Sequence, residues 1–262
     1  MLQDMTGVDP VTIPLDDKKV MSLFQNTEAL GITPEQIGGT KLGALGIPEF
    51  GTDFAMQMVI DVKPQTFSDL VRIAGLSHGT DVWLGNAQDL ILSGTATASE
   101  VIGCRDDIMI YLIHMGLEPI RAFKIMEAAR KGKGLKPDEE EYMREKHVPE
   151  WYIKSCKTVK YLFPKAHAVA YCMMAFRIAW FKVYHPLAFY AAYFYRRSRK
   201  GGFDALLMSG GLDSAIGNIR AIENDADATD KDEDMLTTLE VVYEFYLRGF
   251  EFLPIDLYKS HA

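Results

Sequence analysis

Apolar residues recur at helical spacing along most of this chain. Between residues 53 and 62, Phe54, Met58 and Val62 lie four apart, which places them on one face of a helix. Similar patterns and helix-start signals predict helices at 17–25, 66–73, 97–104, 106–115, 119–130, 138–146, 149–162, 166–184, 186–200 and 234–248. Few segments favour strands, and the Gly-containing stretches 38–51 and 75–85 are typical of loops. The sequence therefore predicts a mainly α, multi-helix fold that ends in a short extended segment over 250–258.

Several predicted helices carry recognisable start signals. Thr97 followed by Glu100 is a capping box, and Thr66 followed by Asp69 resembles one. Pro119 is expected at the first position of its helix, where its missing N–H costs nothing. The longest uncharged apolar run, 168–176, is much shorter than the ~18 residues that a membrane span needs. It predicts a buried helix, and no membrane partner is expected.

Charge is distributed unevenly along the 262 residues. The net charge is -8, yet no Asp or Glu occurs between residues 151 and 203. That stretch carries Lys154, Lys157, Lys160, Lys165, Arg177, Lys182, Arg196, Arg197, Arg199 and Lys200. Solvated faces normally mix both signs of charge, so a stretch with bases only indicates a polyanionic partner such as nucleic acid. The alternative is a chance run on a solvated face.

Cysteine usage and the N-terminus both indicate a cytoplasmic protein. Cys104, Cys156 and Cys172 form no CxxC pair, and we interpret them as reduced core thiols. The first residues, MLQDMTGVDP, have neither a basic start nor an apolar run, so no signal peptide is expected.

A first constellation of candidate site residues lies between Gly75 and Asn86. It contains small, hydroxyl and polar residues, namely Ser77, His78, Gly79, Thr80, Asp81 and Asn86, together with Trp83. Glycine lets a ligand approach the backbone closely, and an exposed indole offers a stacking face for a base. The alternative is a helix end followed by a structured loop, in which Asp81 caps the chain and Trp83 fills the core.

A second constellation lies at the start of the most apolar predicted helix, in the sequence FPKAHAVAY. Free N–H groups at a helix N-terminus favour an anion. Lys165 adds a point charge there, and His167 adds a second donor on the same face as Tyr171. In the alternative reading, His167 is a core histidine with satisfied hydrogen bonds and Lys165 is simply solvated.

Two further basic or acidic segments are weaker candidates. The turn with Arg130, Lys131 and Lys133 could touch a DNA or triphosphate backbone, or be an ordinary basic helix end. Asp106 and Asp107 could bind Mg²⁺, but adjacent carboxylates at a helix start more often cap the helix. Arg105 is the better ligand candidate, because a guanidinium matches phosphate geometry.

One motif points to a different function. The sequence SGGLDS at 209–214 matches the pyrophosphate-binding loop of ATP pyrophosphatases. That loop follows a strand in an α/β domain, whereas here only 205–208 could form a strand and no alternating strand–helix pattern follows. No Walker loop, nucleophile elbow or HExxH motif occurs, so no complete active site is expected.

At these same motifs the chain resembles the PolC-type alpha subunit of bacterial DNA polymerase III. The similarity is carried by GVDPVTIPLDDKKVMSLF, GLSHGTDVWLGNAQDLI, CRDDIMIYLI, KIMEAARKGKGL, FPKAHAVAYCMMAFRIAWFKVYHPLAFYAAYF and TLEVVYEFYLRGFEF. It is weakest over 201–232. The KAHA segment is similar to a wider KSHA motif, with Ala166 in place of Ser.

The resemblance implies the fingers of a DNA-directed DNA polymerase, a nucleotidyltransferase of DNA replication. It implies that Arg105, Lys165 and His167 contact the triphosphate of the incoming dNTP. It also implies that the Ser77–Asp81 segment, with Trp83 and Asn86, lines the nucleotide or template pocket. For the DNA backbone the expected contacts are Arg130, Lys131, Lys133, Lys154, Lys157 and Lys160.

The resemblance also predicts how the chain is organised and what lies outside it. We expect a palm-to-fingers connection over 1–50, a helical fingers core over 51–200 and a C-terminal helical part over 201–262. Mg²⁺ would be bound by palm aspartates outside this chain, so the chain alone is expected to be inactive. The implied partners are primer-template DNA, the dNTP, the palm and thumb, and a sliding clamp reached through other parts. The alternative is a helical interaction module that binds protein or nucleic acid and has no nucleotide role.

Overall fold

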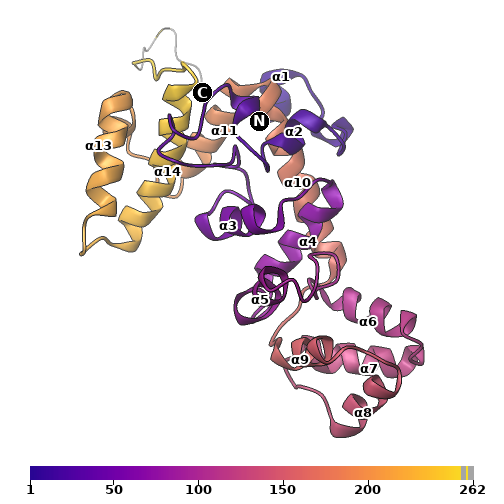
Figure 1. The fold of residues 1–262 in the computed structure, drawn as a ribbon. Helices are drawn as coiled ribbons and strands as arrows, with labels where there is room; N and C mark the ends of the chain where they lie inside the picture. Colours follow the sequence, from indigo (N-terminus) through magenta and orange to yellow (C-terminus); the bar gives the residue numbers. More distant parts are fainter. Residues whose placement is uncertain (255–257, 259–262) are drawn as a thin grey trace. The chain divides into compact units, whose positions relative to one another are not determined.

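The computed structural model describes residues 1–254 and 258. Over these residues the regular structure is helical, and the β-type pairing consists of one isolated antiparallel bridge between Thr80 and Tyr161. The mainly α prediction is therefore confirmed (Figure 1). The predicted extended end over 250–258 lies partly outside the described residues.

The helices follow the predicted order closely. They are α1 Leu2–Thr6, α2 Lys18–Ser22, α3 Asp53–Val62, α4 Phe67–His78, α5 Gln88–Leu92, α6 Arg105–His114, α7 Pro119–Arg130, α8 Pro137–Glu145, α9 Glu150–Thr158, α10 Lys165–Tyr184, α11 Pro186–Ser198, α12 Ala205–Met208, α13 Leu212–Glu223 and α14 Asp230–Leu247. Short 3-10 turns occupy Pro10–Thr12 and Glu28–Leu30, and a π-helical turn, η3, occupies Trp83–Ala87. No helix in the described part of the chain is both long and apolar enough to span a bilayer.

The chain forms two compact units. One unit is Asp53–Ala175, and the other combines Met1–Thr52 with Phe176–Ala262. The first 52 residues therefore pack with the C-terminal part of the chain. Every predicted site residue belongs to the unit Asp53–Ala175, which we call the site unit.

Three local predictions in the site unit are wrong. Helix α4 opens with the expected capping box of Thr66 and Asp69, but it continues to His78 instead of ending near residue 73. Gly75 is thus helical, and the helix passes so close to Gly103 that an added Cβ would lie 2.7 Å from its carbonyl oxygen. The Thr97–Glu100 pair makes the hydrogen bonds of a capping box, but a turn follows instead of the predicted helix 97–104. Helix α9 ends at Thr158 rather than at residue 162, because the chain after it pairs with Thr80.

The other unit has a polar network inside its apolar core. The Lys182 ammonium is completely buried and donates to the carbonyl oxygens of Gly43 (2.8 Å) and Leu45 (2.6 Å). It also contacts the buried Glu244 carboxylate at 2.8 Å, to which the Tyr190 hydroxyl donates at 2.6 Å. The interpretation of every base in 151–203 as polyanion-facing is therefore wrong for Lys182.

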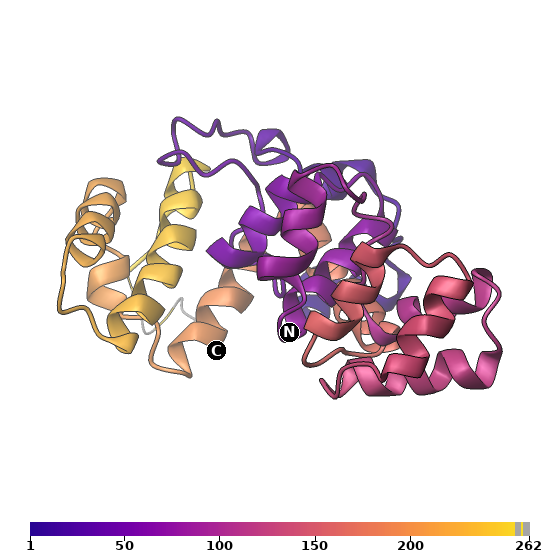
Figure 2. The ribbon, with the colours of Figure 1, turned by 60° about the horizontal axis from the view of Figure 1, so that its bottom comes forward.

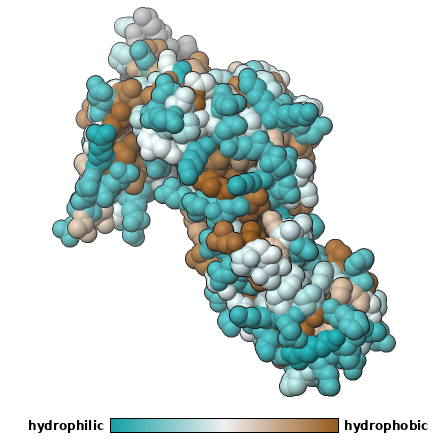
Figure 3. All heavy atoms as spheres, in the orientation of Figure 1, coloured by the Kyte–Doolittle hydropathy of each residue, from teal (hydrophilic) through white to brown (hydrophobic). Residues whose placement is uncertain are grey.

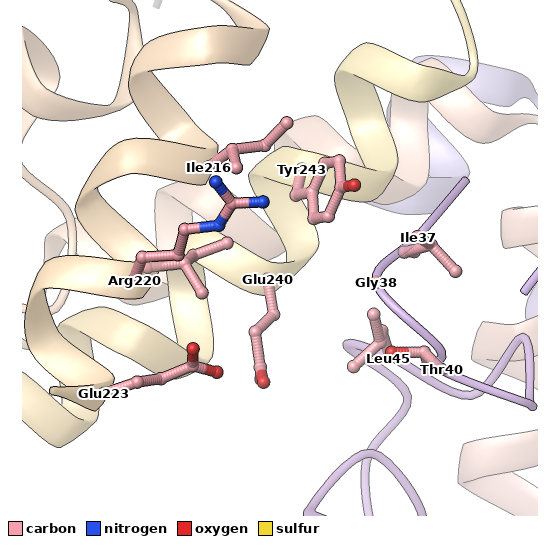
Figure 4. Close-up of a pocket in the computed structure, with 10 residues that line it drawn as sticks. Ile37, Gly38, Thr40, Leu45, Ile216, Arg220, Glu223, Glu240 and Tyr243 are labelled. Atoms are coloured by element: carbon pink, nitrogen blue, oxygen red, sulfur yellow. The ribbon is translucent and has the colours of Figure 1, made fainter. Parts of the chain in front are cut away.

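Helices α13 and α14 lie side by side in both ribbon views (Figures 1 and 2). Together with the loop at 37–45 they border a hollow of about 250 Å³, lined by Ile216, Ile219 and Tyr243 among others (Figure 4). Apolar surface is visible between these two helices in Figure 3.

The SGGLDS motif joins α12 to α13, and Ala205–Met208 is helical rather than a strand. The described residues therefore lack the strand that an ATP pyrophosphatase loop follows.

Candidate functional site

The N-terminal ends of α6 and α10 are tied together in the site unit. The Arg105 N–H donates to the Phe163 carbonyl oxygen at 3.1 Å, and the Lys165 N–H donates to Asp106 Oδ2 at 2.7 Å. Lys165 Nζ lies 3.6 Å from Asp107 Oδ1. Arg105 and Lys165 are the first residues of their helices, so two helix N-termini meet at one place, with the Lys165 ammonium beside them. Such an arrangement favours a polyanion.

The two carboxylates beside this place have structural partners. Asp107 Oδ2 accepts hydrogen bonds from the backbone N–H groups of Gly103 (3.1 Å) and Cys104 (3.0 Å), which completes a capping box at α6. Burial raises the pKa of the Cys104 thiol to about 12, so the thiol stays neutral. Both carboxylates therefore hold backbone N–H groups at the starts of α6 and α10, which confirms the capping interpretation for Asp107.

Aromatic and imidazole rings gather next to Lys165. The His167 ring stacks on Phe163 with centroids 5.0 Å apart, and the Tyr171 ring lies 4.4 Å away. His78, at the end of α4, brings its ring to 6.2 Å from His167. The His78 Nδ1 lies 2.6 Å from the Ala74 carbonyl oxygen, so Nδ1 carries the proton in that hydrogen bond.

The chain after α4 turns sharply against the segment before α10. A Cβ on Gly79 would lie 2.2 Å from Val82 Cγ2 and 2.7 Å from the Tyr161 carbonyl oxygen, so only glycine fits. The Thr80 N–H donates to that carbonyl at 3.0 Å, and Asp81 adopts a positive φ of 56°. The segment 77–81 is thereby held beside the rings of Phe163 and His167.

Two residues predicted for the pocket are instead buried. The Trp83 indole is only 4% exposed, so it offers no stacking face in this structure. Asn86 is 6% exposed; its side chain accepts from the Ser155 hydroxyl at 2.8 Å and donates to the Asp81 carbonyl oxygen at 3.4 Å. The π-helical turn directs both side chains inward. We therefore correct their assignment from nucleotide contacts to supports of the 81–87 turn.

The six predicted DNA-backbone cations fall into two groups. Arg130 and Lys131 pair with Glu127, and Lys157 pairs with Glu140 at 2.7 Å. Hydrogen bonds from Arg130 and Lys131 lower the pKa of Glu127 to about 2. The other three are exposed and have no ion pair with any described residue, namely Lys133, Lys154 and Lys160. The turn at 130–134 lies against Lys160, whose carbonyl oxygen is 2.6 Å from the position of a Cβ on Gly132.

Comparison with known proteins identifies the family. Residues 1–150 match the model of the bacterial DNA polymerase III alpha subunit finger domain. The chain belongs to this family. Over its whole length it is 57% identical to the DNA polymerase III PolC-type of Streptococcus suis and to that of Bacillus subtilis, and 56% identical to that of Streptococcus pyogenes. It spans 18% of the length of each of these relatives.

In this finger-domain chain, the structure brings together most of the predicted nucleotide residues. Arg105, Lys165, His167 and the segment 77–81 share one region, whereas Trp83 and Asn86 lie in the interior. Sequence reasoning missed the rings of Phe163 and Tyr161. Phe163 lies four residues before His167, as His167 lies before Tyr171, so the regular spacing of rings along 163–171 was an available signal.

Proposed function

We propose that this chain is the finger portion of a PolC-type replicative DNA polymerase, and that it binds the triphosphate of the incoming dNTP. The observation that carries the proposal is the convergence of Arg105, Lys165 and His167 at the joined N-terminal ends of α6 and α10. Lys165 is 45% exposed, so its ammonium is accessible to a ligand.

Each residue has a defined part in binding. Lys165 and the half-buried Arg105 offset the negative charge of the triphosphate, and the N-terminal ends of the two helix dipoles add partial positive charge. His167 is oriented by stacking on Phe163 and offers a ring N–H to a phosphate oxygen. Phosphoryl transfer depends on such positioning and charge neutralisation. The reaction also uses a divalent metal ion, which we propose is Mg²⁺. Its carboxylate ligands would come from parts of the polymerase outside this chain.

The exposed cations extend the proposal to DNA. Lys133, Lys154 and Lys160 are exposed on the site unit, have no ion pair to a described residue, and are suited to phosphates of the primer-template backbone. The palm, the thumb and the sliding clamp are reached through other parts of the polymerase, which works in the cytoplasm. The three cysteines are buried thiols that form no disulfide among the described residues, as suits a reducing compartment.

The test replaces the corresponding segment of the full-length Bacillus subtilis relative with this chain. In that chimera, Lys165→Met removes the ammonium and keeps the side-chain stem. The expected result is a fall of about 10-fold or more in kcat/KM for dNTP, with the KM for primer-template unchanged. Lys124→Met, an exposed lysine of α7 outside the site, is the matched control. Unchanged dNTP kinetics in Lys165→Met would refute the proposal.

A further inference from the structure

We propose that Asp106 and Asp107 are positioning residues for the triphosphate site. Asp106 fixes the start of α10, and Asp107 holds the Lys165 ammonium until a triphosphate replaces it. This inference rests on the proposed function and adds how the free protein keeps its binding cation in place.

Asp106 acts on the backbone. Its Oδ2 accepts the Lys165 N–H at 2.7 Å, while the Arg105 N–H next to it donates to the Phe163 carbonyl oxygen at 3.1 Å. These two hydrogen bonds join chain segments that are far apart in sequence, and they fix the position of the start of α10 relative to the start of α6. Because Lys165 and His167 are on the first turn of α10, a shift of that turn would move both side chains.

Asp107 uses its two oxygens differently. Oδ2 is anchored by the N–H groups of Gly103 and Cys104, and Arg72 Nη1 lies 3.9 Å from it. Oδ1 faces the Lys165 ammonium at 3.6 Å, which is longer than a normal hydrogen bond.

Exposure separates the fixed partner from the movable one. The Asp107 side chain is 17% exposed and held by its capping bonds, whereas the Lys165 side chain is 45% exposed. A triphosphate oxygen can make a shorter, charge-assisted hydrogen bond to the ammonium than Asp107 does. The ion pair therefore keeps Lys165 over the site, and the ligand can displace the carboxylate without disturbing the cap.

Asp107→Asn separates positioning from folding, and it is made in the same chimera. The asparagine oxygen can keep the capping bonds, while its amide nitrogen faces Lys165 and ends the ion pair. Losing a negative charge beside the triphosphate should lower the KM for dNTP about 2- to 5-fold. Because Asp107 has already released Lys165 when the triphosphate is bound, kcat should stay within about 2-fold of wild type. A general structural defect would raise KM instead.

The matched control is Asp232→Asn. Asp232 is the carboxylate of the capping box at α14, in the other compact unit, where its Oδ2 accepts the Thr229 N–H at 2.9 Å. This variant makes the same chemical change at the same helix position, and both kinetic constants should stay within about 2-fold of wild type. Added to Lys165→Met, Asp107→Asn should lower the KM for dNTP less than it does in wild type, because both act through one ammonium.

Asp106 is tested with a pair of variants. Asp106→Asn and Asp106→Ala both remove the charge, but only alanine removes the acceptor for the Lys165 N–H. We expect kcat within about 3-fold of wild type for asparagine and at least about 10-fold lower for alanine. Equal kcat values for the two variants would overturn the role of Asp106.

The outcomes distinguish this inference from the function on which it rests. If Lys165→Met impairs dNTP use while Asp107→Asn behaves like Asp232→Asn, only the role of Asp107 is overturned. The same conclusion follows if Asp107→Asn raises the KM for dNTP or if its effect adds fully to that of Lys165→Met. If Lys165→Met leaves dNTP kinetics unchanged, the proposed function itself fails.

Discussion

The buried Lys182 makes the strongest prediction about stability. Replacing it with methionine keeps an unbranched side chain of similar length but removes the ammonium. The Glu244 carboxylate then loses its buried countercharge, and the carbonyl oxygens of Gly43 and Leu45 lose their donor. Tyr190 still donates to Glu244, so one hydrogen bond remains.

The magnitude follows from these losses. Breaking a buried ion pair by removing one partner costs about 3–5 kcal/mol, and each unsatisfied buried carbonyl adds roughly 1–3 kcal/mol if no water reaches it. We therefore expect Lys182→Met to lower the free energy of unfolding by about 3–5 kcal/mol or more. Urea unfolding of the 262-residue chain, followed by far-UV circular dichroism, measures this. Lys18→Met, at the exposed start of α2, should change it by less than about 0.5 kcal/mol.

The dependence on pH gives a second readout of the same group. Burial lowers the pKa of Lys182 from 10.5 to about 8. The unfolded chain therefore binds more protons than the folded chain between these values, and stability rises with pH across that window. The difference in stability between wild type and Lys182→Met should widen as the pH increases from 8 to 10. A loss below about 1 kcal/mol at pH 7, or a difference that narrows with rising pH, would refute this account of the network.

Three further results are expected. Gly79→Ala should destabilise the chain by about 1–3 kcal/mol in thermal unfolding, because its Cβ overlaps Val82, whereas Gly217→Ala in α13, where a Cβ meets nothing, should be neutral or stabilising. NMR titration of the Glu127 carboxyl should give a midpoint near 2, and Arg130→Ala should raise this midpoint. The contribution of the ionised Glu127 to stability should be lost as the pH falls from 4.5 to 2. In a plot of the logarithm of the DNA-binding constant against the logarithm of salt concentration, a triple alanine variant should show a slope smaller in magnitude by about 2–3 than wild type. An unchanged slope would argue against contacts of the three replaced lysines with the DNA backbone. The variant combines Lys133→Ala, Lys154→Ala and Lys160→Ala.

Much of the fold could be predicted because helix signals are local. The capping box at Thr66 and the proline at 119 act within a few residues, and each lies at the expected helix end. The errors occur where contacts between segments far apart in sequence determine the local structure. Gly75 reads as a helix stop, yet it is the residue that lets α4 pass close to Gly103, and nothing near it in sequence shows this.

The same distinction holds for the candidate site. Lys165 and His167 could be selected because they lie at the start of a predicted helix among small and aromatic residues. Arg105 could be selected because a guanidinium matches phosphate geometry. Trp83 could not be placed, because an indole in a glycine-rich segment can either stack on a ligand or fill the core, and only the packing of the 81–87 turn decides. Asp107 could be identified as a cap from sequence, but its approach to Lys165 depends on tertiary structure.

The run of bases at 151–203 shows why charge along a sequence overstates charge on a surface. The carboxylates that neutralise it come from outside the run: Glu140 pairs with Lys157, Asp107 with Lys165, Glu244 with Lys182 and Asp234 with Arg197. A solvent-exposed pair contributes little to stability, but it still reduces the charge that a phosphate meets. The cations that remain unpaired among the described residues should therefore dominate binding to DNA, and removing a neutralising carboxylate should strengthen it. Glu140→Gln, which releases Lys157, is expected to increase the affinity for DNA at low salt, and an unchanged affinity would show that Lys157 lies outside the DNA contact surface.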